Sequence, residues 1–466
     1  MEGLAFAFLN IFDILSLLHL SVSVMKKQLY EKMESLFHLI EHNYQESHPL
    51  ELMLWKLARG NTYNMRVVGL EGIKRFRKEH PDCAITFKPN HLSEADFILL
   101  GLLFRENKMR VVTEGGANLF IEDIDLFKDV IPYILKLNLN PGGEYQSMSI
   151  AKYLSSRGAF KVFREPIEIT QDDGSVIKLG QKEILSLTRA YRYHIVKEKE
   201  MYVTFPGFSE VKSGFFDLLK KNGIKTGRSY TGKIDGFHHL PFQMDIEASL
   251  YTGVDVYIVD VNIAYEQVME DLNFKELTRL HDAGVSKNDI YVKDLGYIIK
   301  EFCRDIRKGN LSIKFGQPRK IDTSALKDGL VGRKIKAAAH KYAEETYSRV
   351  LSMQPLFPAN IYFSAFDEHF NRMPVRVMKE KIDDLRDHLR TLTWGNERRS
   401  VDLYNVMGYN NHIISTDEII NRTFQNFNVG DRRITEIDGD MFVVNNRDVA
   451  QQYKNHTAHF FEIEDK

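Results

Sequence analysis

Residues 86–104 read TFKPNHLSEADFILLGLLF, a β-prone segment that enters a polar loop and leaves it as a long apolar run. This pattern predicts a strand, a short loop and a buried helix in succession. The loop contains His91, and Asp96 follows it five positions later. In a chain with 16 His residues, roughly one His-x4-Asp match is expected by chance, so the spacing alone is weak evidence of a site.

A second match to the same spacing, NNHIISTDEII, provides a comparison. There His412 follows a loop rich in Gly and Asn, whereas Asp417 belongs to STDE, which is typical of the N-cap and first turn of a helix. Helix capping is a sufficient explanation for Asp417. We therefore predict that His91, and not His412, belongs to a functional site.

Residues 61–350 alternate between β-prone and helical segments. The β-prone runs are MRVVGL, CAITFK, MRVVTE, AFKVF, MYVTF, VDVYIVDVNI and LSIKFG, and the helical patterns between them include EADFILLGLLF, MSIAKYLSS and EILSLTRAYRYHIVKE. This alternation predicts an α/β domain with a central mixed β-sheet flanked by helices. Ligands of such sheets bind outside the carboxyl ends of the strands, and His91 lies there because it follows CAITFK.

Helix geometry limits how His91 and Asp96 can meet. Five residues along an ideal helix turn by about 140°, so two mid-helix side chains at this spacing cannot face each other. His91 must lie in the loop, and Asp96 in the first helical turn can then reach one imidazole nitrogen and leave the other free as a base. In the alternative interpretation Asp96 is only the N3 acid of a capping box whose N-cap is Ser93. The residues leave both interpretations open.

The first 25 residues contain GLAFAFLNIFDILSLLHLSVSVM, which is long enough to span a bilayer. Asn10, Asp13, Ser16 and His19 recur every three positions and form one polar stripe, as in a helix that lies in a membrane interface or covers a core. Asp13 disfavours a membrane span, and the missing basic residue before the apolar run disfavours a cleavable signal peptide. We expect an amphipathic helix that contacts a membrane, with a spanning anchor as the alternative.

Two further segments flank the α/β domain. Residues 26–60 have apolar residues at helical spacing and predict a helical segment. Residues 351–466 predict a mostly helical extension, in which VMKEKIDDLRDHLRTL packs one face and exposes the other. No independent catalytic set is evident in this extension, so we expect it to pack against the α/β domain or to contact a partner.

Composition excludes several classes of protein. With 466 residues, 43% hydrophobic and 27% charged, the chain is globular and can form two or three folded units. A net charge of -1 and the lack of a local basic patch with interleaved aromatic residues argue against a nucleic-acid partner. Cys83 and Cys303 are the only cysteines, so we expect buried thiols, no disulfide and no structural zinc.

Several motifs resemble those of the glycerolipid acyltransferase superfamily. NHLSEADFILL resembles the first, Asn-His-x4-Asp before an apolar helix, and RGAFKVFRE resembles the second. TGRSYTGKIDG is similar to the third motif of glycerol-3-phosphate acyltransferases, and VDVYIVDVNIAYEQV resembles the fourth. LSIKFGQPRKID resembles the strand and turn that close the domain, and DVAQQYKNHTAHFF is similar to a C-terminal helix of the long enzymes. The matches follow the family order.

The resemblance implies transfer of a fatty acyl group from a thioester, acyl-CoA or acyl-acyl carrier protein, to the sn-1 hydroxyl of glycerol 3-phosphate. His91 would be the general base and Asp96 would orient it. The residues implied to bind the acceptor and its phosphate are Arg164, Arg228, Ser229 and Lys233, and Asn90 and Glu210 are further candidates. Lys88 and Arg192 are also available, but only because of their proximity or helical position and not because they match a motif. The resemblance implies no cofactor besides the thioester and association with the cytoplasmic face of a membrane.

The chain departs from the family pattern at two places. In the third motif FPGFSE and GRSYTGK are separated by an insertion between Glu210 and Gly227, which puts the role of Glu210 in doubt. In the fourth motif Asp260 replaces a proline, and an acid in an apolar strand needs a partner or a raised pKa. Dihydroxyacetone phosphate or a lysophospholipid as acceptor, and a non-catalytic lipid- or partner-binding protein on this fold, are the alternatives.

Two other enzyme classes have weaker sequence support. PGFSEV lacks the closing glycine of a serine-hydrolase nucleophile elbow. His238 and His239 are adjacent and have no Cys or Glu at metal-ligand spacing, which disfavours a metalloenzyme.

Overall fold

The computed structural model describes the chain in several ranges, with a few single positions and runs of two or three residues between them: 62–116, 159–162, 167–170, 176–207, 236–273, 287–303, 306–326, 332–366, 371–394, 414–428 and 432–461. The predicted N-terminal helix of residues 1–25 and the helical segment 26–60 lie outside these residues. Within the described ranges, no helix combines the length and the apolar composition needed to cross a bilayer.

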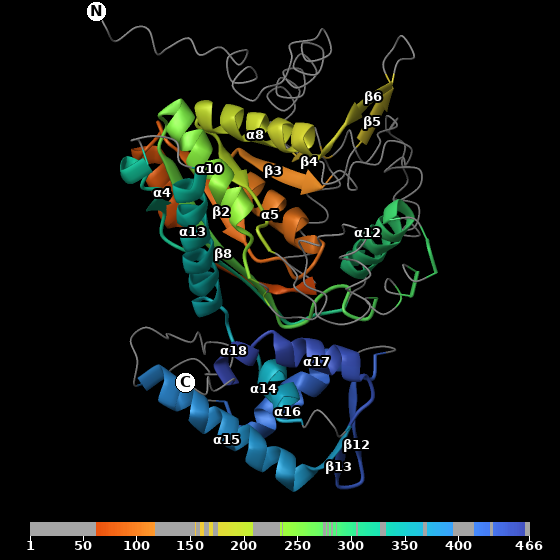
Figure 1. Cartoon of the computed structure of the whole chain (residues 1–466). Coiled ribbons are helices and arrows are strands. Elements are labelled where there is room, and N and C mark those ends of the chain that lie inside the picture. Colours follow the sequence, from red (N-terminus) through yellow and green to blue (C-terminus); the bar gives the residue numbers. More distant parts are fainter. Residues whose placement is uncertain are drawn as a thin grey trace, which may run out of the picture.

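A mixed β-sheet forms the centre of the α/β unit (Figure 1). Its strand order is β1, β9, β8, β2, β7, β3, β4. The short strand β10 is an additional partner of β8 outside this order. The neighbours β8, β2, β7, β3 and β4 run parallel, whereas β9 and β10 pair antiparallel with β8. The strands are β1 (Asn64–Val68), β2 (Ala84–Pro89), β3 (Val111–Gly116), β4 (Ala159–Val162), β7 (Met201–Val203), β8 (Val256–Tyr265), β9 (Asn310–Phe315) and β10 (Arg319–Lys320).

Helices cover both faces of this sheet. One hydrophobic core joins it to α4 (Leu70–Glu79) and α5 (Ala95–Glu106), with a contribution from α12 (Lys287–Cys303). A second core joins the opposite face to α8 (Gln181–Lys197), α10 (His239–Thr252) and α13 (Gly332–Ser352). Successive side chains of β2 point to opposite faces of the sheet. Ile85 and Phe87 therefore enter the first core, whereas Ala84 enters the second. The predicted α/β fold with a mixed sheet between helices is confirmed.

Asp260 is the acid that interrupts the apolar pattern of β8. Arg319 of β10 donates from Nη2 to Asp260 Oδ1 at 2.8 Å and also to Thr346 of α13. Burial raises the pKa of the Asp260 carboxyl, and the Arg319 guanidinium offsets part of this rise. Both outcomes that the sequence allowed for this acid therefore occur together, and the ion pair attaches β10 to β8.

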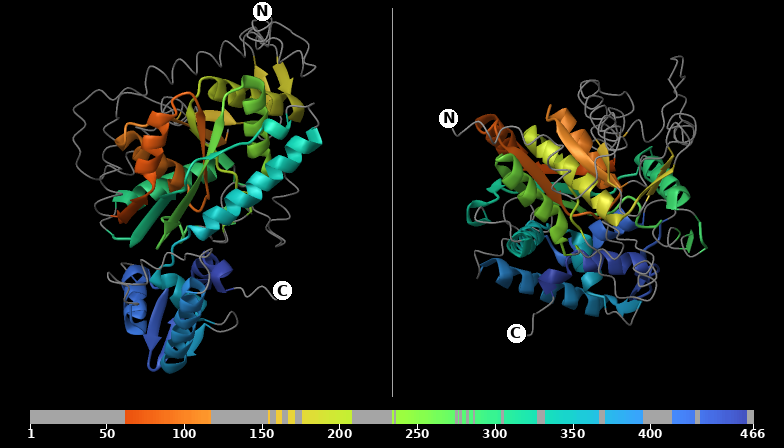
Figure 2. Two further views of the ribbon diagram at one scale, coloured as in Figure 1. Left: turned by 90° about the vertical axis from the view of Figure 1, so that its left-hand side faces the viewer. Right: turned by 45° about the horizontal axis from the view of Figure 1, so that its top comes forward.

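A smaller α/β unit follows α13, which leads from the sheet towards it (Figure 2). It contains a three-stranded antiparallel sheet in the order β11, β13, β12 and its own hydrophobic core between Leu356 and Phe460. We call it the C-terminal unit; its elements are α14 (Pro358–Ser364), β11 (Arg372–Pro374), α15 (Val375–Trp394), α16 (Thr416–Phe427), β12 (Thr435–Asp438), β13 (Met441–Val444), α17 (Arg447–Asn455) and α18 (Ala458–Phe461). Elsewhere, β5 (Ile167–Thr170) and β6 (Val176–Leu179) form a separate antiparallel hairpin, and η4 (Ser324–Leu326) is a short 3₁₀ turn.

His456 lies in the core of the C-terminal unit, just after α17. Its side chain is almost fully buried beside the Tyr453 ring, and Nε2 has no hydrogen-bond partner among the described residues. Burial lowers the pKa of His456 to about 4, and the nearby Asp271 carboxylate only partly counteracts this effect. The folded protein therefore keeps this imidazole neutral at pH values where an unfolded chain protonates it.

We expect His456 to destabilise the fold as the pH falls. Between pH 6.5 and about 4 the unfolded state binds a proton at His456 that the folded state does not, so the free energy of unfolding decreases towards acid. The full effect is about 3 kcal/mol, reached near the lower end of this window. Urea denaturation at pH 7 and pH 4.5 should show a smaller acid loss for His456→Phe than for the wild type. Equal losses in the two proteins would contradict the prediction.

Candidate active site

Asn90 fixes the exit of the chain from β2. Its backbone N–H donates to Val261 O, and its side-chain amide both donates to Ile263 O and accepts from Ile263 N at 2.8 Å. The amide thus imitates a peptide group and prolongs the pairing of β2 with β8 by one step. Asn90 is buried and both ends of its amide are occupied, so its role is to place the following residue, His91, at the carboxyl end of the sheet.

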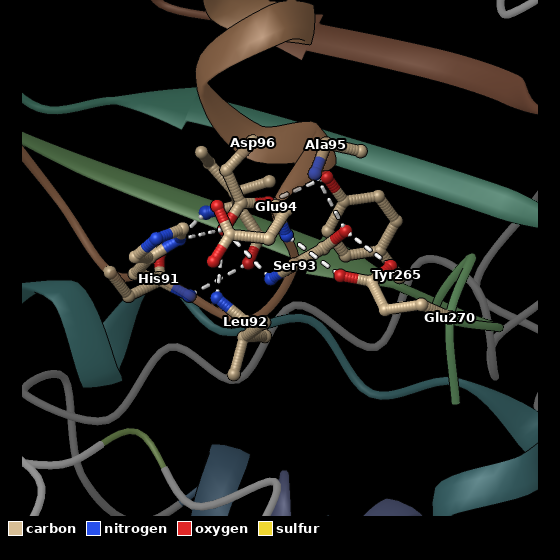
Figure 3. Close-up of polar contacts among 10 residues, drawn as sticks. His91, Leu92, Ser93, Glu94, Ala95, Asp96, Tyr265 and Glu270 are labelled. Carbon is tan, nitrogen blue, oxygen red and sulfur yellow. Dashed lines mark hydrogen bonds and ion pairs between the residues drawn. The ribbon is translucent and has the colours of Figure 1, made fainter. Parts of the chain in front are cut away.

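His91 and Asp96 are in direct contact (Figure 3). His91 Nδ1 lies 2.9 Å from Asp96 Oδ2, and Phe205 packs against the imidazole ring with a centroid distance of 4.6 Å. A carboxylate can only accept, so Nδ1 carries the hydrogen, and in the neutral form of the ring Nε2 holds the lone pair. No residue among those described forms a hydrogen bond with Nε2, and the His91 side chain is 12% exposed. In this orientation Nε2 is the ring nitrogen that could exchange a proton with a ligand.

Asp96 accepts four hydrogen bonds. Besides His91, the backbone N–H groups of Leu92 and Ser93 donate to Oδ2 at 2.8 and 3.0 Å. The Tyr265 hydroxyl, at the end of β8, donates to Oδ1 at 2.6 Å. Burial, with a smaller contribution from the Asp96 charge, raises the pKa of Tyr265 well above its usual value, so the phenol remains a donor. Both oxygens of this fully buried carboxylate thus accept hydrogen bonds.

The Asp96 carboxylate also contacts the turn that leads into α5. Ser93 Oγ accepts from the backbone N–H of Ala95 at 3.0 Å, while Asp96 reaches back to the backbone N–H of Ser93. This reciprocal pair resembles a capping box, although the regular helix α5 begins at Ala95. One Asp96 oxygen thus contacts both the imidazole and the turn before the helix, so Asp96 is not only a capping acid. The N-cap of α5 itself is Glu94, and not Ser93 as the capping interpretation predicts.

Glu270 holds the turn between His91 and Asp96 from the other side. It lies just after β8 and is fully buried, and its Oε2 accepts from the Ser93 hydroxyl at 2.7 Å. Its Oε1 accepts from the backbone N–H of Glu94, also at 2.7 Å. These contacts are drawn in Figure 3 beside the His91–Asp96 pair. Glu270 thus fixes the first turn of α5 from outside the helix.

Lys88 and Arg192 form a buried ion network with Asp245 and Glu114. Lys88 Nζ lies 2.7 Å from Asp245 Oδ2, close enough for an ion pair although the approach is not that of a hydrogen bond. Arg192 contacts Asp245 and Glu114 and donates to the Thr204 hydroxyl at 3.0 Å. Burial lowers the pKa of Lys88 to about 8, against the opposing effect of Asp245. Both cations are buried inside the fold, so neither is placed to bind a substrate phosphate.

The remaining predicted site residues lie outside the described residues. They are Glu210 and the four candidate ligands of the acceptor phosphate, Arg164, Arg228, Ser229 and Lys233. His238 and His239 are described, and the His239 ring stacks on His340 at 3.9 Å. In the described part of the chain, no three His, Cys, Asp or Glu side chains are grouped so that they could hold a metal ion.

Comparisons with known proteins add no family assignment. No family model matches the chain, and no curated protein matches it significantly. The acyltransferase interpretation therefore rests on the sequence motifs and on the geometry at His91.

Two residues of the site were not singled out from the sequence, Tyr265 and Glu270. Both belong to the segment VDVYIVDVNIAYEQVMED, whose first part resembles the fourth motif. The available signal was their position, because polar residues at or just after the carboxyl end of a strand in a parallel array lie near the loop after the neighbouring strand. A prediction would have required knowing that β8 is adjacent to β2.

Proposed function

We propose that this protein is an O-acyltransferase that moves a fatty acyl group from a thioester to the sn-1 hydroxyl of glycerol 3-phosphate, giving lysophosphatidate. The observation that carries the proposal is the His91–Asp96 pair at the carboxyl end of β2, with the tautomer fixed and Nε2 directed away from Asp96. The same residues belong to the stretch that resembles the Asn-His-x4-Asp motif. The sequence resemblance and the local chemistry thus support the same reaction.

The chemistry needs one proton carrier. His91 Nε2 removes the proton from the acceptor hydroxyl as its oxygen attacks the thioester carbonyl. The carbonyl oxygen becomes negatively charged in a tetrahedral intermediate, which then collapses and breaks the carbon–sulfur bond. The imidazolium returns its proton to the departing thiolate, so the products are an ester and a free thiol. Asp96 favours this cycle because its charge stabilises the imidazolium while the hydrogen bond to Nδ1 keeps the ring in place.

Recognition of the acceptor phosphate is assigned to the arginines and the lysine of the sequence motifs. Arg164 and Arg228 offer bidentate forks, Lys233 a point charge and Ser229 a hydroxyl donor, which together suit a phosphate group. We further propose that residues 1–25 attach the enzyme to the cytoplasmic face of a membrane, where acyl donors and the lipid product reside.

The proposal is tested with the purified full-length protein. Acyl-CoA and acyl-acyl carrier protein are each supplied with glycerol 3-phosphate, dihydroxyacetone phosphate or a lysophospholipid, and free thiol and acylated product are measured. We expect thiol release that depends on glycerol 3-phosphate and matches product formation one for one. Preference for another acceptor would revise the substrate. Acyl-chain binding without thiol release in any combination would favour a non-catalytic lipid-binding protein.

Asp96→Asn should retain the fold and lose only part of the activity. With the amide oxygen in the Oδ2 position, the three donors His91, Leu92 and Ser93 keep an acceptor, and the amide NH₂ can donate to the Tyr265 hydroxyl. The ring tautomer is kept, but a charge-assisted hydrogen bond becomes a neutral one, which costs about 1.4 kcal/mol or a tenfold lower kcat.

Asp96→Ala is the matched comparison, because it removes the acceptor altogether. Its kcat should fall well below that of Asp96→Asn when both are measured by steady-state thiol release. Equal activity of the two variants would show that Asp96 acts through its charge alone and not by holding the ring.

A further inference from the structure

The loop that follows β8, residues 266–271, carries three buried carboxylates. Glu266, Glu270 and Asp271 are each at most 3% exposed. A buried carboxylate is costly unless it is paired or hydrogen-bonded, so their partners determine where this loop can lie. The partners belong to two different parts of the molecule. Glu270 contacts the turn between His91 and Asp96, whereas Glu266 and Asp271 contact the C-terminal unit.

The C-terminal unit holds this loop through two side chains at Asp271. Arg432, just before β12, donates to both Asp271 oxygens, at 2.8 and 2.7 Å. The Tyr453 hydroxyl of α17 donates to Asp271 Oδ2 at 2.6 Å and accepts from the backbone N–H of Val268 at 2.7 Å. All of these side chains are buried. Paired donors on a planar carboxylate fix its orientation as well as its position.

A third contact anchors the start of the loop. Asn426 of α16 donates to Glu266 Oε1 at 2.7 Å, and Asn310 of β9 donates to Oε2 from its backbone and its side chain. Gly309, at a φ of +79°, lets Glu266 approach, because a Cβ there would lie 2.5 Å from the Glu266 oxygen. The loop is thus fastened to the C-terminal unit at both ends.

The opposite side of the loop reaches the candidate active site. Glu270 directly precedes Asp271 and accepts from the Ser93 hydroxyl and from the Glu94 backbone N–H. Ser93 also donates its own backbone N–H to Asp96, whose Oδ2 holds His91. Buried polar contacts, joined by the peptide bond between Glu270 and Asp271, therefore connect Arg432 to the imidazole.

We propose that Arg432 and Glu270 are positioning residues, through which the C-terminal unit fixes the geometry of the His91–Asp96 pair. The expected effect on acyl transfer rests on the proposed function, whereas the effect on the imidazole does not. Loss of Glu270 leaves the turn at Ser93 without its outer acceptor, and loss of Arg432 leaves the Asp271 charge buried without its cation. In both cases the segment that carries Asp96 can move relative to His91.

Four variants of the full-length protein test this proposal. Glu270→Ala and Arg432→Ala remove the contacts. Glu270→Gln keeps the side-chain shape and Arg432→Lys keeps the positive charge, and these two variants test the proposal if the alanine variants do not fold. Arg372→Gln is the control, because it breaks an ion pair with Asp438 in the same unit that is about half exposed. Circular dichroism and melting curves identify the variants that remain folded at the assay temperature.

Two readouts are needed. The first is steady-state kinetics: kcat should fall about 10- to 100-fold, the cost of misplacing a catalytic group by about 1 Å, with KM nearly unchanged. The conservative variants should lose less, and Arg372→Gln nothing. The second readout is nuclear magnetic resonance of ¹⁵N-labelled histidine, with the His91 signals assigned by their absence in His91→Ala. Folded Glu270 and Arg432 variants should show a mixture of His91 tautomers in place of the single Nδ1–H form.

The two readouts separate this proposal from the proposed function. A changed His91 tautomer in a protein that transfers no acyl group would support the positioning role and refute the acyltransferase activity. An active wild type whose folded Glu270 and Arg432 variants keep both kcat and the His91 signals would overturn the positioning role. A loss of kcat with unchanged His91 signals would overturn it as well, because the effect would then not pass through the imidazole.

Discussion

Replacing His91 with alanine should lower kcat for acyl transfer by a factor of about 10² to 10⁴, the usual contribution of a general base. The reason is the position of Nε2, which is the one ring nitrogen not engaged with Asp96 and lies at the carboxyl end of β2. Acceptor and donor KM should change little, because substrate binding is assigned to other residues. Steady-state thiol release by the folded variant measures the effect.

His412→Ala is the matched control for this prediction. His412 and Asp417 have the same His-x4-Asp spacing as His91 and Asp96. Asp417, however, lies in the first turn of α16, is exposed, and pairs with Lys379 at 2.7 Å. Ser415 is the N-cap there, with its hydroxyl accepting from Glu418 N, as the sequence STDE predicts. His412 itself lies outside the described residues. Comparable losses in both folded variants would show that the spacing was assigned to the wrong pair.

The local structure around His91 could be predicted from the sequence, because it depends on neighbours in the chain. The change from a β-prone run to a long apolar run placed a strand before His91 and a helix after it, as observed in β2 and α5. The five-residue spacing placed His91 in the loop. What the sequence could not decide was whether Asp96 only supports the first turn of the helix or also contacts the imidazole, because both roles require an acid at this position. In the structure one Asp96 oxygen contacts His91 and the backbone of the turn.

The rest of the site depends on contacts between distant parts of the chain. Tyr265 and Glu270 are 169 and 177 positions away from the residues they contact, and only the pairing of β8 with β2 brings them together. The same limit applies to Lys88 and Arg192. Their positions in the sequence are compatible with binding a phosphate, but Asp245, 53 positions after Arg192, pairs with both of them inside the fold.

The network around Lys88 provides the second large expected effect, on stability. Asp245→Leu should lower the free energy of unfolding by about 3 to 5 kcal/mol, the usual cost of leaving a buried charge without its partner. Asp245 is fully buried on α10, contacts Lys88 and Arg192, and accepts from the Tyr202 hydroxyl at 2.8 Å. Glu247→Gln, on the same helix, removes a partly exposed ion pair with Arg189 and should cost less than about 1 kcal/mol.

A double variant tests whether charge balance is the cause. The four ionic groups are Lys88, Arg192, Asp245 and Glu114, two of each sign. Asp245→Leu leaves two cations with one anion, whereas Lys88→Met with Asp245→Leu leaves the balanced pair of Arg192 and Glu114. Because removing both partners of a buried pair costs less than removing one, the double variant should be more stable than Asp245→Leu alone, although it carries one more substitution. Chemical denaturation of the wild type, of Asp245→Leu and of the double variant measures this order of stability. If the double variant is instead the least stable, packing around Asp245 and not its charge holds this part of the fold together.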